Sequence, residues 1–517
     1  MKSIYLYILT GILLFLQPGI SEGQEDTLRI ETTLDQQMVS EKHLWLNSMN
    51  AAGLKVYSVR DHNNFDLHYR SEEGAFRKTM TPSGLSQYGM HTSGYKGLNF
   101  IDFQGSFRYN RNEEKKVEWM AMMDPNRSNP FLLADSIGGN WKKDYYTLQM
   151  KMGTDQGWDA LRLGLSAKYQ VAQGGRDNDP RPKSTIKDLS LSPGLVWDIV
   201  PSHHLGMAYH YHDYRQDVDI MNKYGVGGNV LYKIMGLALL EQPLVKPSVE
   251  YRIDSWSHGA SLQYNARTNP VDLLTEWSYR LIHEKGVQYP YRAMQDPETG
   301  EILSMADSDI RFSEKIYDAL IQATFGKEGI MHKIILKGTV AEGKTFDVST
   351  EQVEFIQDRT SAKVEYHLFN QPAGLHVRFH SGYRQNAQEN LFYGTRDIES
   401  LEFRASGEKE FTLLQIDFAS RLTLGCAYNI GSKLNIDPQS DFINETYDIT
   451  NPYVRNNYAF LTSGYYFGQA GVTYYHPLNR KTRLFVDLNA GYYAARSSGD
   501  FNGTNRMTIN SRIGILF

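Results

Sequence analysis

Apolar and polar residues alternate one by one over the last twelve residues of the chain. One parity of this segment is mostly apolar and carries Met507, Ile509, Ile513, Ile515 and Phe517. The other parity is mostly polar and carries Arg506, Thr508, Asn510 and Arg512. Successive side chains of a β-strand point to opposite faces, so this period of two predicts a strand with one apolar and one wet face.

The same alternation recurs through most of the chain. Residues 161–169, 205–211, 273–281, 364–368 and 484–492 repeat it, and several of these runs end in Tyr or Trp. Aromatic side chains of this kind are typical of the interface between a membrane and water. The mean hydropathy is −0.48, and the longest apolar stretch is residues 4–16, so a bundle of membrane helices is excluded.

Short and long connections between these segments take turns along the sequence. Short ones are predicted at residues 201–203, 267–270, 327–329, 370–373, 406–409 and 477–481. Long ones, rich in Asn, Asp, Gly and Pro, are predicted at residues 172–188, 214–227, 284–313, 342–359, 384–396, 431–456 and 494–505. A soluble sandwich has no reason for such sidedness, whereas a barrel in a bilayer has short turns on one side and free loops on the other.

The fold class predicted is therefore all-β, a transmembrane antiparallel β-barrel with short periplasmic turns and long extracellular loops. About 460 residues at roughly 50 per hairpin and loop give about 18 strands, within a range of about 16 to 20. Residues 230–264 and 413–428 can each be read as one strand or two, which is the main uncertainty in the count.

The first residues have the features of an export signal. Lys2 precedes the apolar run, and Ser21-Glu22-Gly23 forms a small-x-small cleavage site, which predicts a signal peptide over residues 1–23. The single cysteine, Cys426, allows no disulfide within the chain and no Cys-based metal site. A net charge of −5 gives no reason to expect a nucleic-acid partner.

The chain resembles the β-barrel proteins of the Gram-negative outer membrane in its predicted signal peptide, its alternating strands and its terminal segment, residues 512–517. It looks most like the large uncharacterised barrels of similar length. The resemblance implies an outer-membrane location, contact with outer-membrane lipid, and recognition of Phe517 as an insertion signal by the barrel-assembly machinery. The alternative for Phe517 is a strand that merely ends in an aromatic residue.

Residues 24–55 precede the predicted barrel, residues 56–517, and form a periplasmic or plug segment in this interpretation. Asp35 or Ser40 could cap a short helix there, with Gly53 as its stop. Asn50-Ala51-Ala52-Gly53-Leu54 resembles the Asn-Pro-Ala-Gly segment near the N-terminus of the long-chain fatty-acid transporter family, with Ala51 in place of the proline. The segment could plug the lumen, or simply lead into the first strand.

Two histidines lie two residues apart on the predicted inner face of one strand. His210 and His212 have the spacing of metal ligands on a strand, and Asp217 or Asp219 could supply a third ligand. Polar residues are also what a wet lumen requires, so metal binding is the lesser interpretation and no cofactor is predicted.

A charged patch is predicted on two neighbouring strands joined by the turn at residues 370–373. Because Val364 and Phe379 belong to the outward parity, six residues face the lumen together: Lys363, Glu365, His367, His376, Arg378 and His380. A row of cationic groups in a pore raises the local concentration of anions. The alternative is a hydrogen-bonded ladder that packs a filled lumen.

The function predicted is a channel or transporter that passes or binds a small solute. One alternative is a plugged transporter for hydrophobic substrates, or a scaffold for periplasmic or surface partner proteins. Another is a receptor or adhesin that displays long loops such as residues 284–313 and 431–456. The sequence contains no G-x-S-x-G, H-E-x-x-H or phosphate-loop motif, so an enzyme is not predicted.

Overall fold

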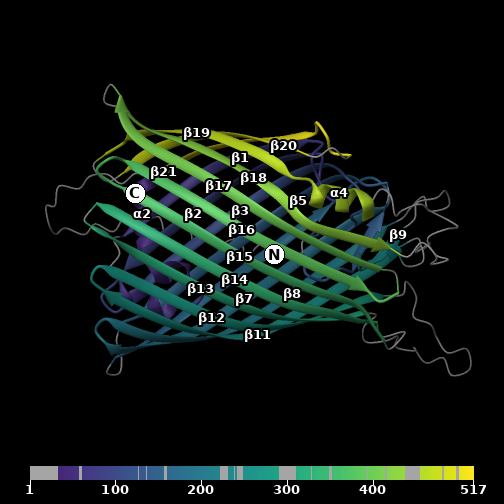
Figure 1. Ribbon diagram of the computed structural model, residues 1–517, viewed down its shortest axis with the longest axis horizontal. Helices are drawn as coiled ribbons and strands as arrows, with labels where there is room; N and C mark the ends of the chain where they lie inside the picture. The colour runs from purple at the N-terminus through teal and green to yellow at the C-terminus, as the bar shows by residue number, and fades with distance from the viewer. Residues whose placement is uncertain are drawn as a thin grey trace, which may run out of the picture.

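Eighteen strands form one closed antiparallel sheet in the computed structural model (Figure 1). The model describes residues 33–517 except 58–60, 126, 136, 156–159, 222–230, 238, 241–247, 290–309, 328, 348–351, 393, 414–415, 437–453, 480–481 and 497–499. The sheet closes where the first strand, β1, pairs with the last, β21, from Asn64 opposite Leu516 to Gly74 opposite Arg506. The strand number lies within the predicted range, and the predicted barrel is confirmed.

The strands take up most of the chain and follow one another around the barrel. Their bounds are β1 His62–Gly74, β2 Gly84–Gly97, β3 Ile101–Val117, β5 Gly139–Thr154, β6 Leu161–Gly175, β7 Arg181–Val200, β8 His203–Met221, β11 Ser248–Thr268, β12 Val271–Tyr289, β13 Ile310–Lys327, β14 Ile330–Asp347, β15 Gln352–Asn370, β16 Leu375–Asn390, β17 Gly394–Leu413, β18 Ile416–Ile436, β19 Tyr465–Pro477, β20 Arg483–Ala495 and β21 Asn505–Leu516.

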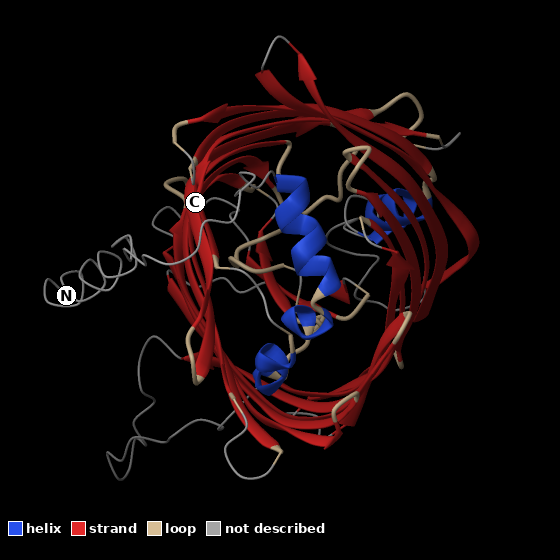
Figure 2. Ribbon diagram, turned by 90° about the vertical axis from the view of Figure 1, so that its left-hand side faces the viewer, coloured by secondary structure: helices blue, strands red, loops and turns tan. Residues whose placement is uncertain are grey.

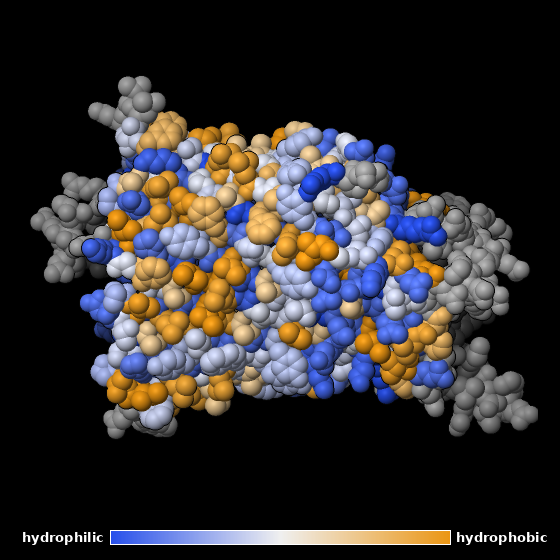
Figure 3. All heavy atoms as spheres, viewed as in Figure 1, coloured by the Kyte–Doolittle hydropathy of each residue, from blue (hydrophilic) through white to orange (hydrophobic). Residues whose placement is uncertain are grey.

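The two parities of each strand face opposite sides of the wall, as the alternation predicted. On β8, Leu205 and Met207 are 42% and 51% exposed, whereas His204 and His210 are buried. Large apolar side chains therefore gather on the side of the barrel (Figure 3). This exterior suits a bilayer, in which every backbone group must be paired within a closed sheet. None of the described helices is long and apolar enough to cross a membrane.

Connections at one end of the barrel are consistently short. Two residues separate β7 from β8, β11 from β12, β13 from β14 and β17 from β18. This short-turn end also receives the C-terminus (Figure 1). Several predicted boundaries are wrong, because residues 406–409 lie inside β17 and the predicted long loops 172–188, 342–359 and 384–396 are mostly strand. Polar residues on both faces break the alternation there, while backbone pairing between β16 and β17 continues to Asn390 and Gly394.

The N-terminal segment lies inside the ring of strands, near the short-turn end (Figure 2). It consists of α2 (Thr33–Lys42) and two 3₁₀ helices, η1 (Leu44–Asn47) and η2 (Ala51–Val56). Helix η2 packs against β5, β6 and β7. Leu44, Trp45 and Leu54 have no exposed surface, which anchors the segment by apolar burial. The signal peptide predicted for residues 1–23 lies outside the described residues.

The other end of the barrel, the long-loop end, has its own internal core. The connection after β3 contributes Met120, Met122 and β4 (Leu132–Asp135), which pairs with β9 (Leu231–Met235), itself paired with β10 (Leu239–Leu240). These residues bury against inward side chains such as Ile186 and Ile253. Helix α4 (Asn456–Thr462) lies at the same end, where Phe460 packs on Phe76. The lumen is thus partly filled by two separate insertions.

Candidate functional site: a polar cavity in the barrel lumen

The β15–β16 hairpin carries the six residues predicted as a lumenal patch. Val364 and Phe379 are 48% and 52% exposed on the outer face, so the opposite parity points inward. The register places Glu365 opposite His380 and His367 opposite Arg378. The structure thus brings Lys363, Glu365, His367, His376, Arg378 and His380 onto one patch of the inner wall.

Glu365 is the centre of this patch. Its carboxylate lies 3.2 Å from His367 Nε2 and 3.3 Å from His380 Nδ1, and it pairs with the Lys363 ammonium. His376 Nε2 lies 3.4 Å from His367 Nδ1, and the His376 ring stacks on Phe369 with ring centroids 3.9 Å apart. The predicted ladder of hydrogen bonds therefore exists in part, because several of the six residues bind one another.

A cavity of about 600 Å³ opens in front of this patch, between the wall and α2. Every described residue that lines it is polar or glycine: Gln37, Lys363, Glu365, His376, Arg378, His380, Arg384, Glu402, Arg404, Ser406, Gly407, Glu408, Arg421, Thr423, Gln469 and Asn489. Five of them are Lys or Arg and three are Glu, so the described lining has two positive charges in excess. An apolar ligand would meet no apolar side chain among these residues and would have to desolvate the charged ones.

Part of the positive charge of the lining is neutralised by ion pairs between side chains on the inner wall. Arg421 binds Glu408 through two contacts of 3.0 and 3.2 Å, and lies 3.9 Å from Asp487. Arg512 binds Asp487 in turn at 3.0 Å. Arg404 pairs with Glu402. These contacts form a ladder of alternating positive and negative side chains from β17 to β21. The ion pairs hold these side chains in fixed positions against the inner wall.

Two arginines do not join the ladder. Arg378 and Arg384 lie on the inner face of β16, and neither has a carboxylate partner among the described residues. Arg378 Nε is buried without a hydrogen-bond partner in the same part of the chain. A buried donor without a partner is costly, so a ligand that accepts its hydrogen bond would be stabilised. These two guanidinium groups are the strongest anchors for a solute in the lumen.

The cationic groups continue toward the long-loop end. Arg396 on β17 lies opposite Gln388 on β16, and Gln388 is four residues closer to the long-loop end than Arg384. Lys78, in the connection between β1 and β2, lies close enough to Arg396 and Arg384 for both to lower the pKa of its ammonium, although burial is the larger cause. Positive charge therefore extends from the loops into the cavity.

The predicted pair His210 and His212 does not converge on a common ligand position. His210 lies between two hydroxyl groups, with Nδ1 2.9 Å from Ser192 Oγ and Nε2 2.7 Å from Ser261 Oγ. His212 Nε2 lies 2.8 Å from Asp188. Within the described ranges, no group of three or more His, Cys, Asp or Glu residues could hold a metal ion.

The sequence interpretation missed the cavity residues on β17, β18, β19, β20 and α2. The inward parity of β17 contains Glu402, Arg404 and Glu408, which continue the patch next to β16. Applying the same parity to this strand would have found them, but the misplaced turn at residues 406–409 interrupted it. Gln37 had no detectable signal, because it enters the lumen on a helix far away in sequence.

The N-terminal segment forms the other boundary of the lumen and is held by polar contacts on every side. Asn50 Nδ2 donates to Leu195 O, Met207 O and Gln263 Oε1 at 3.0 to 3.2 Å, and its Oδ1 accepts from Ala52 N. Four wall glycines, Gly153, Gly164, Gly194 and Gly206, leave room for this close approach.

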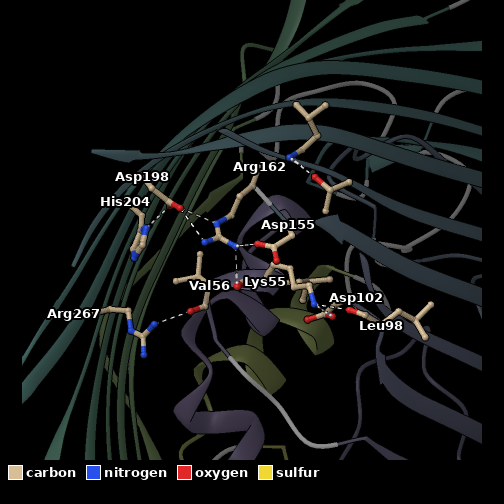
Figure 4. A network of polar contacts seen from close by, with 12 residues as sticks. Lys55, Val56, Leu98, Asp102, Asp155, Arg162, Asp198, His204 and Arg267 are labelled. Atoms are coloured by element: carbon tan, nitrogen blue, oxygen red, sulfur yellow. Dashed lines mark hydrogen bonds and ion pairs between the residues drawn. The ribbon is translucent and has the colours of Figure 1, made fainter. Parts of the chain in front are cut away.

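A second set of contacts holds the end of the segment, where it leaves η2 (Figure 4). Arg162 donates to Lys55 O at 3.0 Å and also pairs with Asp198 at 2.9 Å. Arg267 donates to Val56 O at 2.6 Å, and Lys55 pairs with Asp102 at 3.0 Å. The strands β3, β6, β7 and β11 thus bind one short peptide, which indicates a fixed insert.

The closed barrel with a polar lumen and an apolar exterior has the architecture of the β-barrels of the Gram-negative outer membrane. Over residues 51–517 the chain matches a family described as a family of unknown function, DUF6850, and it belongs to that family. No curated protein matches it in sequence. The matched region begins at Ala51, in η2, and includes every barrel strand.

Solved structures that are similar to the chain include a ferric siderophore receptor, a copper transporter and an iron transporter. The ferric preacinetobactin receptor BauA from Acinetobacter baumannii is 9% identical, with 89% of this chain and 80% of that chain covered and a TM-score of 0.41. The copper transporter OprC is 10% identical, with the same coverages and TM-score. The iron transporter FrpB from Neisseria meningitidis is 10% identical, with 90% and 82% covered and a TM-score of 0.38.

Proposed function

We propose that the protein lies in the outer membrane and binds or passes a small hydrophilic solute that carries negative charge. The observation that supports this is the lumenal cavity, whose described lining is entirely polar or glycine and has two positive charges in excess. In this arrangement the short-turn end faces the periplasm and the long-loop end faces outward. Phe517 would serve as the insertion signal for the barrel-assembly machinery.

The physical argument is electrostatic. A cleft lined by one sign of charge between low-dielectric walls concentrates the opposite ion and raises its rate of entry. Lys78, Arg396 and Arg384 would draw an anion from the long-loop end, and Arg378, which pairs with none of the described carboxylates, would hold it. Hydrogen bonds to a guanidinium group are about twice as strong as neutral ones.

The same lining disfavours the transporter of hydrophobic substrates. Such a ligand would have to strip water from charged groups without replacing their hydrogen bonds, which is costly. The receptor or adhesin alternative depends on the longest loops, and residues 290–309 and 437–453 of these lie outside the described residues. The scaffold alternative has no specific contact in its support. The anionic solute is therefore the function to test first.

A planar bilayer with a salt gradient tests the proposal. The purified protein is expected to show anion selectivity, measured as a reversal potential, and a double Arg378→Gln, Arg384→Gln variant is expected to lose most of it. Arg215→Gln is the matched control, because Arg215 is an outward-facing arginine paired with Asp254 at 2.6 Å. Equal selectivity in all three proteins would overturn the proposal.

Insertion is checked separately, by partition with envelope fractions and by the shift of the folded barrel on an unheated gel. A protein that conducts nothing is tested by radiolabelled anion binding in detergent with the same variants. Binding that does not depend on Arg378 and Arg384 would also contradict the proposal.

A further inference from the structure

The cavity contains carboxylates and amides as well as arginines, and this mixture restricts the ligand further. Glu402 and Glu408 lie in the lining beside Arg404 and Arg421. A site built for a simple inorganic anion gains nothing from carboxylates, because each one repels the ligand. A ligand that carries both negative groups and hydroxyl groups would use them, since hydroxyl groups donate and carboxylates accept.

Several acceptors and donors in the cavity are left over after the internal contacts are counted. Arg404 binds Glu402 through Oε1 only, so Oε2 takes no hydrogen bond within the described residues. Gln469 Nε2 donates to Asn489 Oδ1 at 2.6 Å. Gln469 Oε1 and Asn489 Nδ2 make no hydrogen bond within the described residues. The register separates Glu402 from Gln469 by four residues along the strands and by two strands, so these groups meet different parts of one extended ligand.

The volume of the cavity and the lack of apolar side chains in its described lining also restrict the size and the chemical class of the ligand. About 600 Å³ lies within the range of roughly 300–1,000 Å³ that sites for organic ligands span, and it is far more than a single inorganic anion needs. Most such sites are largely apolar, yet this one has no apolar side chain in its described lining. The ligand it fits is therefore an organic molecule that is polar over its whole surface.

We propose that the cavity binds an acidic sugar of two or three units, because Arg378 and Arg384 lie six residues apart on β16, about 20 Å along the strand, which one unit does not span. This inference rests on the proposed function and names its substrate class. The carboxylate or sulfate groups of the sugar bind Arg378 and Arg384, and its hydroxyl groups bind Glu402 Oε2, Gln469 and Asn489. Gln37 of α2 contributes from the opposite side, so the N-terminal segment is part of the binding site.

Calorimetry on the full mature chain in detergent tests this class. The probes are galacturonic acid and its dimer and trimer, the neutral sugars galactose and maltotriose, and inorganic phosphate. At least one acidic sugar is expected to bind about tenfold or more tightly than the neutral sugars and phosphate. Glu402→Gln is expected to weaken the acidic sugar by about tenfold, while phosphate binds equally or more tightly. Arg215→Gln again serves as the control, and the gel shift confirms that each variant folds.

The outcomes separate the two proposals. If phosphate binds as tightly as every acidic sugar, and Glu402→Gln strengthens both, the cavity is a plain anion site and the sugar proposal fails alone. If the neutral sugars bind as tightly as the acidic ones and the bilayer shows no anion selectivity, both proposals fail. If no probe binds while anion selectivity is present, the sugar proposal is again overturned and the channel remains.

Discussion

Gly164 on β6 sets how closely the N-terminal segment can approach the barrel wall. A Cβ at this position would lie 2.0 Å from Ala52 N and 2.5 Å from Ala51 C. Both atoms belong to the backbone of η2, so no side chain can rotate away. Ordinary contact begins at 3.4 Å, and Gly164→Ala therefore requires η2 to retreat by about 1.4 Å, the difference between 3.4 and 2.0 Å.

A retreat of that size breaks the contacts that hold the segment. Asn50 Nδ2 lies 3.0 Å from Leu195 O and 3.0 Å from Gln263 Oε1, and Arg162 lies 3.0 Å from Lys55 O. When the movement lies along these bonds, each lengthens to about 4.4 Å, beyond the hydrogen-bond range. Three bonds at about 1 kcal/mol each amount to about 3 kcal/mol, or roughly a hundredfold in the docking equilibrium.

Hydrogen exchange measured by mass spectrometry can detect this change directly. Peptides that cover residues 44–57 are expected to exchange roughly a hundredfold faster in Gly164→Ala, while peptides from β14 keep their protection. Gly338→Ala is the control, because a Cβ at Gly338 on β14 would meet no atom within 4 Å. If residues 44–57 are as protected in Gly164→Ala as in Gly338→Ala, the argument from close approach is refuted.

Three further perturbations address the same insert. Burial lowers the pKa of His43 to about 4 from 6.5, so docking is strongest above about pH 6.5 and weakens by about 3 kcal/mol as the pH falls to 4. Protease cleavage of the segment is expected to rise at pH 5 in the wild type, but not in His43→Gln. Lys333→Met removes the buried ammonium that binds Glu41 O at 2.8 Å and Oε2 at 2.6 Å, so residues 33–42 should lose exchange protection while residues 44–57 keep it. Deletion of residues 24–57 is expected to raise the single-channel conductance. An unchanged conductance would show that another part of the lumen, and not the N-terminal segment, limits the flow of ions.

The barrel itself could be predicted from the sequence because its exterior is a one-dimensional pattern. Lipid accepts only apolar side chains, so Leu205, Met207 and Ile509 had to fall on one parity, and the period of two follows directly. The ends of the strands were harder to predict from the sequence. Beyond the bilayer both parities are wet, and at residues 384–396 the strands continue on backbone pairing alone. A hydropathy pattern cannot detect hydrogen bonds between backbones.

The lumenal patch could be predicted only as far as one hairpin. Parity alone placed Glu365 and His380 side by side, because the turn at residues 371–374 fixes their register. Arg404 and Arg421 required the correct turn between β17 and β18, which the sequence pattern misplaced. Gln37 required the position of α2, which depends on the Glu41–Lys333 pair and on the fit of η2 against wall glycines. These contacts join residues from about one hundred to nearly three hundred positions apart.

The two kinds of arginine in the lumen explain how one wall can be both structural and functional. Arg421 and Arg512 are each fixed by carboxylates on neighbouring strands, so their charge is neutralised locally and contributes to packing. Arg378 and Arg384 project from β16 without such partners in the described residues, and their charge stays available to a ligand. Counting positive residues in the sequence would treat all four alike. Only the pairing distinguishes them, and the pairing identifies β16 as the strand on which substitutions should change solute selectivity without loosening the barrel.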